Sequence, residues 1–370
     1  MPVHLSQITP SIFASLSLEG AQDFLAMGES PGGRELLFLI DGLGADAIEK
    51  YGEFAPAISR LHNFGKIQTS FPSTTATSLA TLTTGELPGV HGMLGYTVQV
   101  PRSGGRILNA LKWDERVDPI NWQSVPTLFE KGAESGISVS HVAAKRYENS
   151  GFTRAVFRGA QYLGANIATD MIAQTKAALK QTPSFVYLYV NDLDVAGHSD
   201  GVGSEKWIAA LSMIDAMYAS LVKELPSKTR IWLTADHGMV SATKKIVIGV
   251  DNPLADEISV IAGEPRARHL YLDPARDSKA ARDEVGAQWR EFLKEDAQVF
   301  TREEAIDAQL FGNRISQESF DRMGEVIAIA QGGVVLIEQS REDKEGAMVG
   351  HHGGNSEIES NVPLLTTTLN

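Results

Sequence analysis

The chain has 370 residues, of which 43% are hydrophobic and 21% charged, a balance typical of a folded globular protein and not of a disordered one. Its formal net charge is −13 and no stretch is rich in lysine and arginine, so a nucleic acid polymer is not an expected partner. Cysteine is absent, which excludes disulfides, thiolate metal sites and a cysteine nucleophile.

The sequence contains no run of the roughly 18 apolar residues that a membrane span requires. Residues 1–20 lack the basic start and the apolar stretch of a signal peptide. We therefore expect a cytoplasmic protein without a membrane partner. The oligomeric state is left open.

Apolar periodicity and turn signals predict alternating strands and helices. The expected elements, in chain order, are a strand at 35–40, a helix at 45–51, a helix that begins close to Thr75, an ordered glycine-rich loop at 85–96, a helix at 127–135, a strand at 137–143, a helix at 167–180, strands at 184–190, 230–235, 246–250, 258–261 and 268–272, a helix at 278–294 with Trp289 and Phe292 on its apolar face, and strands at 332–337 and 361–365. This alternation predicts the α/β class, with a doubly wound, mostly parallel central sheet and helices on both faces. We assign this core to residues 1–250 and 331–370, and a small inserted α+β subdomain or cap to residues 251–330.

Three of the expected buried strands are each followed by a carboxylate, or by a carboxylate and a histidine. These strands and the side chains after them are 35–40 with Asp41, 184–190 with Asp194 and His198, and 230–235 with Asp236 and His237. Ligands of open α/β sheets bind at the carboxyl ends of the strands. Because the end of a buried strand does not otherwise require a carboxylate, the repetition indicates a functional site.

The segment 70–85 is dense in hydroxyl groups. Pro72 disfavours a helical conformation of the residue before it, and Ser73, Thr74 or Thr75 could cap the helix that follows. A hydroxyl at a helix N-terminus lies beside free N–H groups that favour an anion such as phosphate. Taken alone, the segment is more typical of a helix start without chemistry.

Without thiolates, a transition metal is held by imidazole and carboxylate groups, and a catalytic metal pair needs about six of them. The three clusters supply most of this number, and the pair His351-His352 lies between glycines that let the backbone come close. The joint occurrence of these groups predicts a dinuclear metal site.

The order of these motifs resembles that of the alkaline phosphatase superfamily, and most closely its branch of nucleotide pyrophosphatases and type I phosphodiesterases. The matching positions are Asp41, Thr84-Gly85, Pro88 to Gly92, Asp194 with His198, Asp236 to Gly238, and His352-Gly353. The resemblance implies two metal ions, most consistent with Zn²⁺, while Mn²⁺ or Fe would also suit these ligands. One would be held by Asp194, His198 and His352, and the other by Asp41, Asp236 and His237.

The resemblance also implies a threonine nucleophile that bridges to the second metal. In this branch it generally lies ten residues before the glycine of the Thr-Gly pair, which here is Thr75, with Thr74 as the alternative. The implied reaction is attack on a small phosphorylated substrate to form a phosphothreonine, which water then hydrolyses.

One position departs from the pattern of the family. Its diesterases usually carry an asparagine 21 residues after the nucleophile, and here that position is Tyr96, whose phenol can still donate a hydrogen bond to the substrate. Lys145 resembles a phosphate-contacting lysine of related phosphonoacetate hydrolases, although an exposed surface lysine is the competing interpretation. The alternatives to a phosphodiesterase are therefore a phosphomonoesterase or phosphonate hydrolase of the same superfamily, or a metal-stabilised binding protein without activity.

Overall fold

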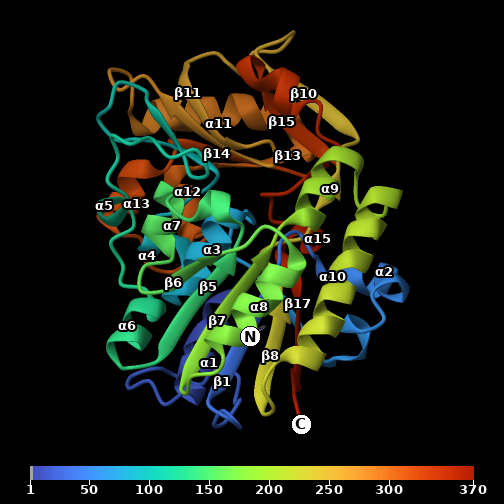
Figure 1. The fold of residues 1–370 in the computed structure, drawn as a ribbon. Helices are drawn as coiled ribbons and strands as arrows, with labels where there is room; N and C mark the ends of the chain where they lie inside the picture. The colour runs from blue at the N-terminus through green and yellow to red at the C-terminus, as the bar shows by residue number, and fades with distance from the viewer. Residues whose placement is uncertain (1–2) are drawn as a thin grey trace.

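The computed structural model describes residues 3–370, in which a seven-stranded sheet flanked by helices forms the centre (Figure 1). The strands of this sheet are, in spatial order, β2 (His62–Gln68), β17 (Asn361–Thr368), β8 (Thr229–Thr234), β1 (Arg34–Ile40), β7 (Ser184–Val190), β5 (Ser138–Ala143) and β6 (Gln161–Gly164). β1 pairs in parallel with both β7 and β8, and β5 pairs in parallel with β7 and β6. β17 is antiparallel to both of its neighbours. The predicted fold class is confirmed.

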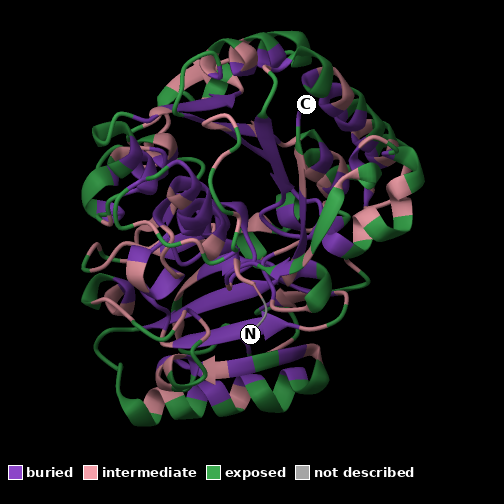
Figure 2. Cartoon of the chain, turned by 90° about the horizontal axis from the view of Figure 1, so that it is seen from below, coloured by how far each residue is buried: buried purple, intermediate pink, exposed green. Residues whose placement is uncertain are grey.

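The central strands are continuous apolar runs because both faces of the sheet are covered. All five residues from Leu36 to Ile40 have 0% exposure, and the predicted strands at 35–40, 184–190 and 230–235 form as β1, β7 and β8. Figure 2 shows these strands buried between helices whose outer faces are exposed.

Four of the helices around the central sheet lie where periodicity predicts them, at 45–51, from close to Thr75, at 127–135 and at 167–180. The helices around this sheet are α1 (Ile8–Ser15), α2 (Ala45–Tyr51), α3 (Thr75–Thr84), α4 (Pro88–His91), α5 (Pro119–Trp122), α6 (Leu128–Glu134), α7 (Gly151–Val156), α8 (Ala168–Ala178), α9 (Asp192–Asp200), α10 (Glu205–Glu224) and α15 (Glu357–Ser360). The sequence analysis did not predict α9 or the long α10, and the loop expected at 85–96 contains α4. Among residues 3–370, the search for a helix long and apolar enough to cross a bilayer finds none.

A second, antiparallel sheet has the strand order β11–β12–β14–β13 and its own hydrophobic cluster. This part of the chain comprises β10 (Lys244–Ile248), β11 (Ile258–Glu264), β12 (Ala267–Leu272), α11 (Lys279–Leu293), β13 (Ala297–Thr301), α12 (Arg302–Asp307), α13 (Gln317–Arg322), β14 (Val326–Ala330), β15 (Val334–Glu338) and α14 (Glu342–Glu345). β10 pairs with β15, and these two strands contribute to the same cluster. In Figure 1 the second sheet lies above α3 and α9. The assignment of residues 251–330 as a separate subdomain stays a prediction.

The helix predicted at 278–294 forms as α11, but the prediction for one of its aromatic residues is wrong. Trp289 is fully buried, whereas Phe292 is 41% exposed. Val285 and Leu293 lie four residues on either side of Trp289, so these three share the buried face and Phe292 lies beside it.

The parallel arrangement of β1, β7 and β8 brings their carboxyl ends to one edge of the sheet. Two short ladders, one of three-residue strands and one of two-residue strands, complete the surroundings of this edge. Their strands are β3 (Thr97–Gln99) with β4 (Ile107–Asn109), and β9 (Val240–Ser241) with β16 (Gly350–His351). The β9–β16 ladder brings the C-terminal histidines beside the loop that follows β8.

Candidate metal centre and active site

Six side chains with metal-ligating atoms gather at this edge in two groups. Within residues 3–370, the groups are Asp194, His198 and His352, and Asp41, Asp236 and His237, with the ligating atoms of each group within 4.8 Å of one another. Each side chain follows the carboxyl end of a strand or lies on α9, which begins directly after β7. The structure therefore brings together all six residues that the family resemblance implies as two ligand sets.

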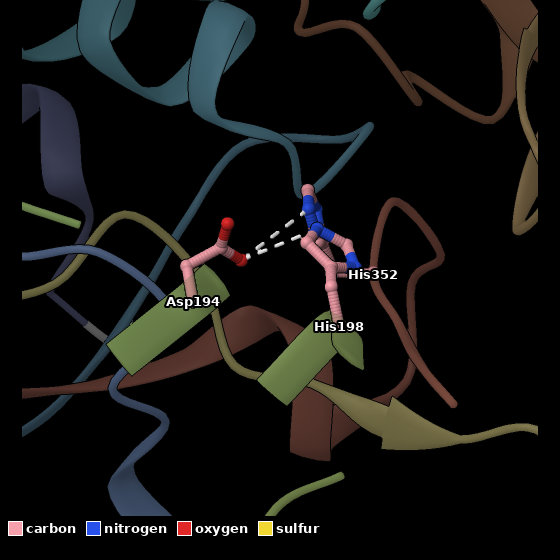
Figure 3. A group of neighbouring side chains, drawn as sticks. All are labelled: Asp194, His198 and His352. Carbon is pink, nitrogen blue, oxygen red and sulfur yellow. Dashed lines mark ion pairs between the residues drawn. The ribbon is translucent and has the colours of Figure 1, made fainter. Parts of the chain in front are cut away.

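In the first group, two imidazoles face one carboxylate (Figure 3). Asp194 Oδ1 lies 3.4 Å from Nε2 of His198 and 3.8 Å from Nε2 of His352. Asp194 and His198 share one face of α9 because residues four apart are neighbours on a helix. His352 reaches them from the turn after β16.

In the second group, His237 Nε2 lies 3.4 Å from Asp41 Oδ1 and 3.5 Å from Asp236 Oδ2. All three side chains are buried. The two groups adjoin, because the rings of His237 and His352 are stacked with their centroids 3.6 Å apart. The arrangement thus forms one dinuclear candidate site.

Each of the three imidazoles in these groups holds its second nitrogen against a backbone carbonyl. The distances are 2.8 Å from His198 Nδ1 to Gly350 O, 3.1 Å from His237 Nδ1 to Gly238 O, and 3.0 Å from His352 Nδ1 to Ser73 O. A carbonyl accepts only from a protonated Nδ1, which leaves Nε2 of each ring, directed toward the carboxylates, as the nitrogen that can bind a metal. This is the tautomer and orientation that a metal ligand requires.

The electrostatics of the site also fit divalent cations. Among the described residues, Asp41 Oδ1, Asp194 Oδ1 and Asp236 Oδ2 are buried and accept no hydrogen bond. Burial, followed by the charges of Asp236 and Asp194, raises the pKa of Asp41 well above its usual value. Burial also raises the pKa of Asp194 and lowers that of His352 well below its usual value. Buried carboxylates this close together are costly unless a cation offsets their charge, so the donor set fits two metal ions.

Thr75 is the first residue of α3 and Thr74 its N-cap. Within the described chain, the side chain of Thr74 makes no capping hydrogen bond, so its hydroxyl does not satisfy the first N–H groups of the helix. Thr75 Oγ1 lies 3.2 Å from Nε2 of His237. Of the two adjacent threonines, Thr75 is the one in contact with a ligand group.

Two cavities meet at Thr75 and Asp194. The larger has a volume of about 570 Å³ and is also lined by Tyr96 and by the first metal-ligand group's two histidines. The smaller, of about 100 Å³, is lined mainly by apolar and aromatic side chains. The exposed Lys145 lines neither of these two cavities, so the structure does not bring it to the other predicted site residues.

The sequence analysis missed three residues that support the site. The Tyr189 hydroxyl donates to Asp41 Oδ2, and the Ser73 carbonyl orients His352. Glu264 lines the larger cavity, and one of its oxygens accepts from the Tyr96 N–H at 2.9 Å. The alternation along β7 places Tyr189 beside the end of β1, but Glu264 comes from the second sheet, and no motif marks it.

His91 belongs to the positions that match the family, but its contacts in this fold are structural. It is buried, its Nδ1 accepts from the Met93 N–H at 3.1 Å, and its Nε2 lies 3.0 Å from Thr81 Oγ1. Burial lowers the pKa of His91 to about 3, so the ring is neutral. It joins α3 to the loop that follows α4.

Comparison with known families agrees with this geometry. A family model described as type I phosphodiesterase / nucleotide pyrophosphatase matches residues 36–355. Ectonucleotide pyrophosphatase/phosphodiesterase family member 1 of Mus musculus is 25% identical over 257 residues, which cover 63% of this chain and 27% of the relative. Venom phosphodiesterase of Macrovipera lebetinus is 25% identical over 227 residues, which cover 55% of this chain and 25% of the relative. The chain thus spans about a quarter of the length of these curated relatives.

Solved structures share the fold over most of the chain. Murine ectonucleotide pyrophosphatase/phosphodiesterase 5 superposes with a TM-score of 0.70 at 17% identity, covering 90% of this chain and 87% of the other. Phosphonoacetate hydrolase from Sinorhizobium meliloti 1021 superposes with a TM-score of 0.67 at 18% identity, covering 91% and 90%. At these identities the likeness concerns the fold alone.

Proposed function

The chain belongs to the type I phosphodiesterase / nucleotide pyrophosphatase family, and from this premise we propose that it is a metal-dependent hydrolase of phosphodiester or pyrophosphate bonds in small substrates. The observation that carries the proposal is the position of Thr75. Its hydroxyl lies at the N-terminus of α3, in contact with His237, and lines both cavities.

The two ligand groups would hold two divalent metal ions, preferably Zn²⁺, and Thr75 lies beside the group of Asp41, Asp236 and His237 through its contact with His237. When bound, such ions neutralise charge on the phosphoryl oxygens and lower the pKa of a coordinated hydroxyl. The three histidines are held for this by their Nδ1 hydrogen bonds, and Tyr189 orients Asp41.

The proposed reaction has two displacements at phosphorus. Thr75 Oγ1 attacks in line, the bond to the leaving group breaks with its electron pair passing to that group, and a phosphothreonine forms. The proton that Thr75 Oγ1 loses in this first step passes to solvent. Water then attacks the same phosphorus and loses a proton to solvent, the bond from phosphorus to Oγ1 breaks with its electron pair passing to Oγ1, and Thr75 takes up a proton again. The free N–H groups of the first turn of α3 bind a non-bridging oxygen, and the Tyr96 phenol is proposed to donate to another.

A phosphomonoesterase or phosphonate hydrolase is the second candidate. It is favoured by Tyr96, which replaces the asparagine usual in the diesterases, while the fold also superposes on that of a phosphonoacetate hydrolase with a TM-score of 0.67. A binding protein in which the threonines only cap α3 is less well supported, because within residues 3–370 the Thr74 side chain forms no cap.

The test is hydrolysis by the zinc-loaded protein of bis-p-nitrophenyl phosphate, p-nitrophenyl phosphate and phosphonoacetate, each with and without chelator. We expect chelator-sensitive turnover, highest on the diester. Faster turnover of the monoester or of phosphonoacetate would favour the second candidate. Absence of turnover on all three, with two metal ions bound per chain, would contradict an enzymatic function.

The cytoplasmic location remains part of the proposal, because it is an expectation from the sequence alone. Two of the relatives described above are an ectonucleotide pyrophosphatase/phosphodiesterase and a venom phosphodiesterase. Fractionation of cells that express the natural gene tests it, and recovery outside the cytoplasm would contradict it.

A further inference from the structure

A buried histidine outside the metal-ligand groups has no hydrogen-bond partner. His141 lies on β5, is 3% exposed and lines the smaller cavity. Within residues 3–370, neither Nδ1 nor Nε2 of its ring forms a hydrogen bond. Burial lowers the pKa of His141 to about 3, so the ring is neutral and offers one N–H donor and one acceptor nitrogen. Because burial of both without partners is costly, this arrangement is typical of a site that a ligand or an ordered water completes.

The aromatic side chains around His141 hold its ring in place but do not bind its nitrogens. The ring centroids of Phe157, Tyr162 and Tyr187 lie 4.1, 4.8 and 5.2 Å from that of His141. The Tyr162 hydroxyl donates to the Ala144 carbonyl at 2.6 Å, and the Tyr187 hydroxyl has no partner among the described residues. A hydrogen-bond partner can reach the imidazole from the cavity that it lines.

The smaller cavity connects His141 with the reacting end of the site. In the register of the sheet, His141 lies opposite Tyr187, three residues before the end of β7. Asp41 and Asp194, in contrast, follow the carboxyl ends of β1 and β7. The cavity is lined by these two carboxylates and Thr75 at the edge of the sheet, and by His141 deeper along β5. A group bound to phosphorus at Thr75 can therefore extend toward His141.

The walls of this cavity are mainly apolar and suit a compact group. Leu79, Ala143 and Phe152 contribute to them from α3, β5 and α7. The volume of about 100 Å³ is below the ~150 Å³ of a cavity that holds benzene. A group of about one six-membered ring, partly in the mouth of the cavity, therefore fits better than a two-ring group. A polar atom at the far end of such a ring would meet His141.

In-line displacement decides which part of a substrate enters this cavity. The attacking and leaving oxygens lie on opposite sides of phosphorus. Thr75 contacts His237, so the leaving group departs on the side of His198 and His352. Of the two cavities, these two histidines line only the larger one. The smaller cavity is therefore left for the group that stays on phosphorus.

We propose that the smaller cavity binds the organic group that stays on phosphorus, and that His141 selects a compact group with a hydrogen-bonding atom at its far end. The inference rests on the proposed function and adds the class of the transferred group. A site that pairs a polar atom of its substrate rejects an apolar group of the same size, because its own polar groups are then left unpaired. His141 is thus a specificity-determining residue and takes no part in bond breaking.

The test compares two esters of the same size and with the same leaving group. 4-Hydroxyphenyl p-nitrophenyl phosphate and 4-methylphenyl p-nitrophenyl phosphate both release p-nitrophenol, and they differ only at the far end of the transferred ring. We expect the wild type to prefer the hydroxyl ester. His141→Phe should lower the ratio of kcat/KM for the hydroxyl ester to that for the methyl ester about tenfold, the value of one hydrogen bond. The exposed His62 on β2 provides the matched control, and His62→Phe leaves this ratio unchanged.

An unchanged ratio in His141→Phe would overturn the inference, and so would a wild type that does not distinguish the two esters. The ratio does not depend on the fraction of folded protein, because both esters report on the same active molecules. The size limit has a test of its own, since 2-naphthyl p-nitrophenyl phosphate should show a lower kcat/KM than the 4-methylphenyl ester. Equal values for these two esters would contradict selection of a compact group.

If the wild type hydrolyses none of these esters, the proposed function fails separately. Titration calorimetry of the zinc-loaded protein with 4-hydroxyphenylphosphonate and 4-methylphenylphosphonate then still tests the cavity. Tighter binding of the hydroxyl compound that is lost in His141→Phe would support the inference. Equal affinities of the wild type for the two compounds would exclude it.

Discussion

Two pairs of adjacent, chemically identical side chains differ in what they can contact. Thr75 contacts His237 while Thr74 is the N-cap of α3, and His352 joins Asp194 while His351 lies against the Met348 carbonyl at 3.3 Å. Each step along a helix or strand turns the side chain to a different direction, so a shift of one residue changes the chemistry completely. Thr75 and His352 are the residues that the family resemblance selects, and their catalytic and ligand roles are proposals.

Replacement of Thr75 is the most direct test of its proposed role as the nucleophile. We expect Thr75→Ala to lower kcat on bis-p-nitrophenyl phosphate by at least about a thousandfold, because no other serine or threonine hydroxyl of the described chain hydrogen-bonds to a side chain of the two ligand groups. Zinc content measured by atomic absorption stays nearly unchanged, since six ligands remain. Thr74→Ala is the matched control and retains most of the activity. A greater loss in Thr74→Ala than in Thr75→Ala would reverse the assignment.

The paired histidines allow a second matched comparison. His352→Asn is expected to reduce bound zinc from about two ions per chain to about one after gel filtration, because it removes an imidazole from the group of Asp194 and His198. His351→Asn leaves the zinc content unchanged, since His351 belongs to neither group among the described residues. Loss of zinc in the second variant alone would show that the wrong histidine was chosen.

Among the elements, the loop that carries His352 is attached to the second sheet by a buried ion pair. Arg266, between β11 and β12, donates from Nε at 3.0 Å and from Nη2 at 2.8 Å to the carboxylate of Glu359, and both side chains have 0% exposure. Glu359 Oε1 also accepts from the Gly354 N–H at 2.8 Å. This pair therefore fixes the second sheet, α15 and the loop after His352 relative to one another.

Breaking this pair is expected to affect both stability and metal binding. Arg266→Leu leaves the charge of Glu359 buried and unpaired, which costs about 3–5 kcal/mol in the free energy of unfolding, measured by urea titration. Zinc affinity also falls because the loop of His352 loosens. Arg276→Gln, which breaks the exposed pair with Glu257, is the control and costs at most about 1 kcal/mol. Equal costs in the two variants would contradict the role of burial.

Across the whole molecule, the structure places buried carboxylates together in a chain that is already negative. The pKa values of Asp41 and Asp194 are raised mainly by burial, so without cations the ionised site opposes folding. Elsewhere the core holds neutral histidines, and burial lowers the pKa of His141 to about 3. Metal ions and protons are therefore expected to control the stability of the entire fold.

Metal removal is predicted to lower the thermal stability of the protein. A ligand that binds only the folded state adds about 4 kcal/mol to the free energy of unfolding when its concentration is 1,000 times its dissociation constant. The Tm measured by calorimetry should therefore rise by several degrees when zinc is added to the chelated protein. The Asp41→Asn/Asp194→Asn double variant should show a much smaller rise. An identical Tm in zinc and in chelator would contradict a dinuclear site.

The pH dependence of the chelated protein follows from His141. The unfolded chain takes up a proton near the ordinary pKa of 6.5, while the folded protein does so only near 3, so stability is full above pH 6.5 and is lost as the pH falls. Between these two pKa values, the histidine lowers the free energy of unfolding by about 1.4 kcal/mol for each pH unit that the pH falls. Urea unfolding between pH 6 and 4 should show a flatter dependence for His141→Phe than for the wild type. Parallel curves for the two proteins would refute the assignment.

Sequence periodicity was sufficient for the strands β1, β5, β7 and β8 and for the helices α2, α3, α6, α8 and α11, because these depend on local apolar patterns. The ligand motifs could be located because they follow the ends of predicted strands. Phe292 shows the limit of such patterns, since the edge of a helix face depends on what packs against it. Only the tertiary structure decided that Glu264 lines the same cavity as Thr75, and that Lys145 lies outside both cavities. These placements depend on how the second sheet sits above the first, and contacts between residues far apart in the chain leave no periodic signal in the sequence.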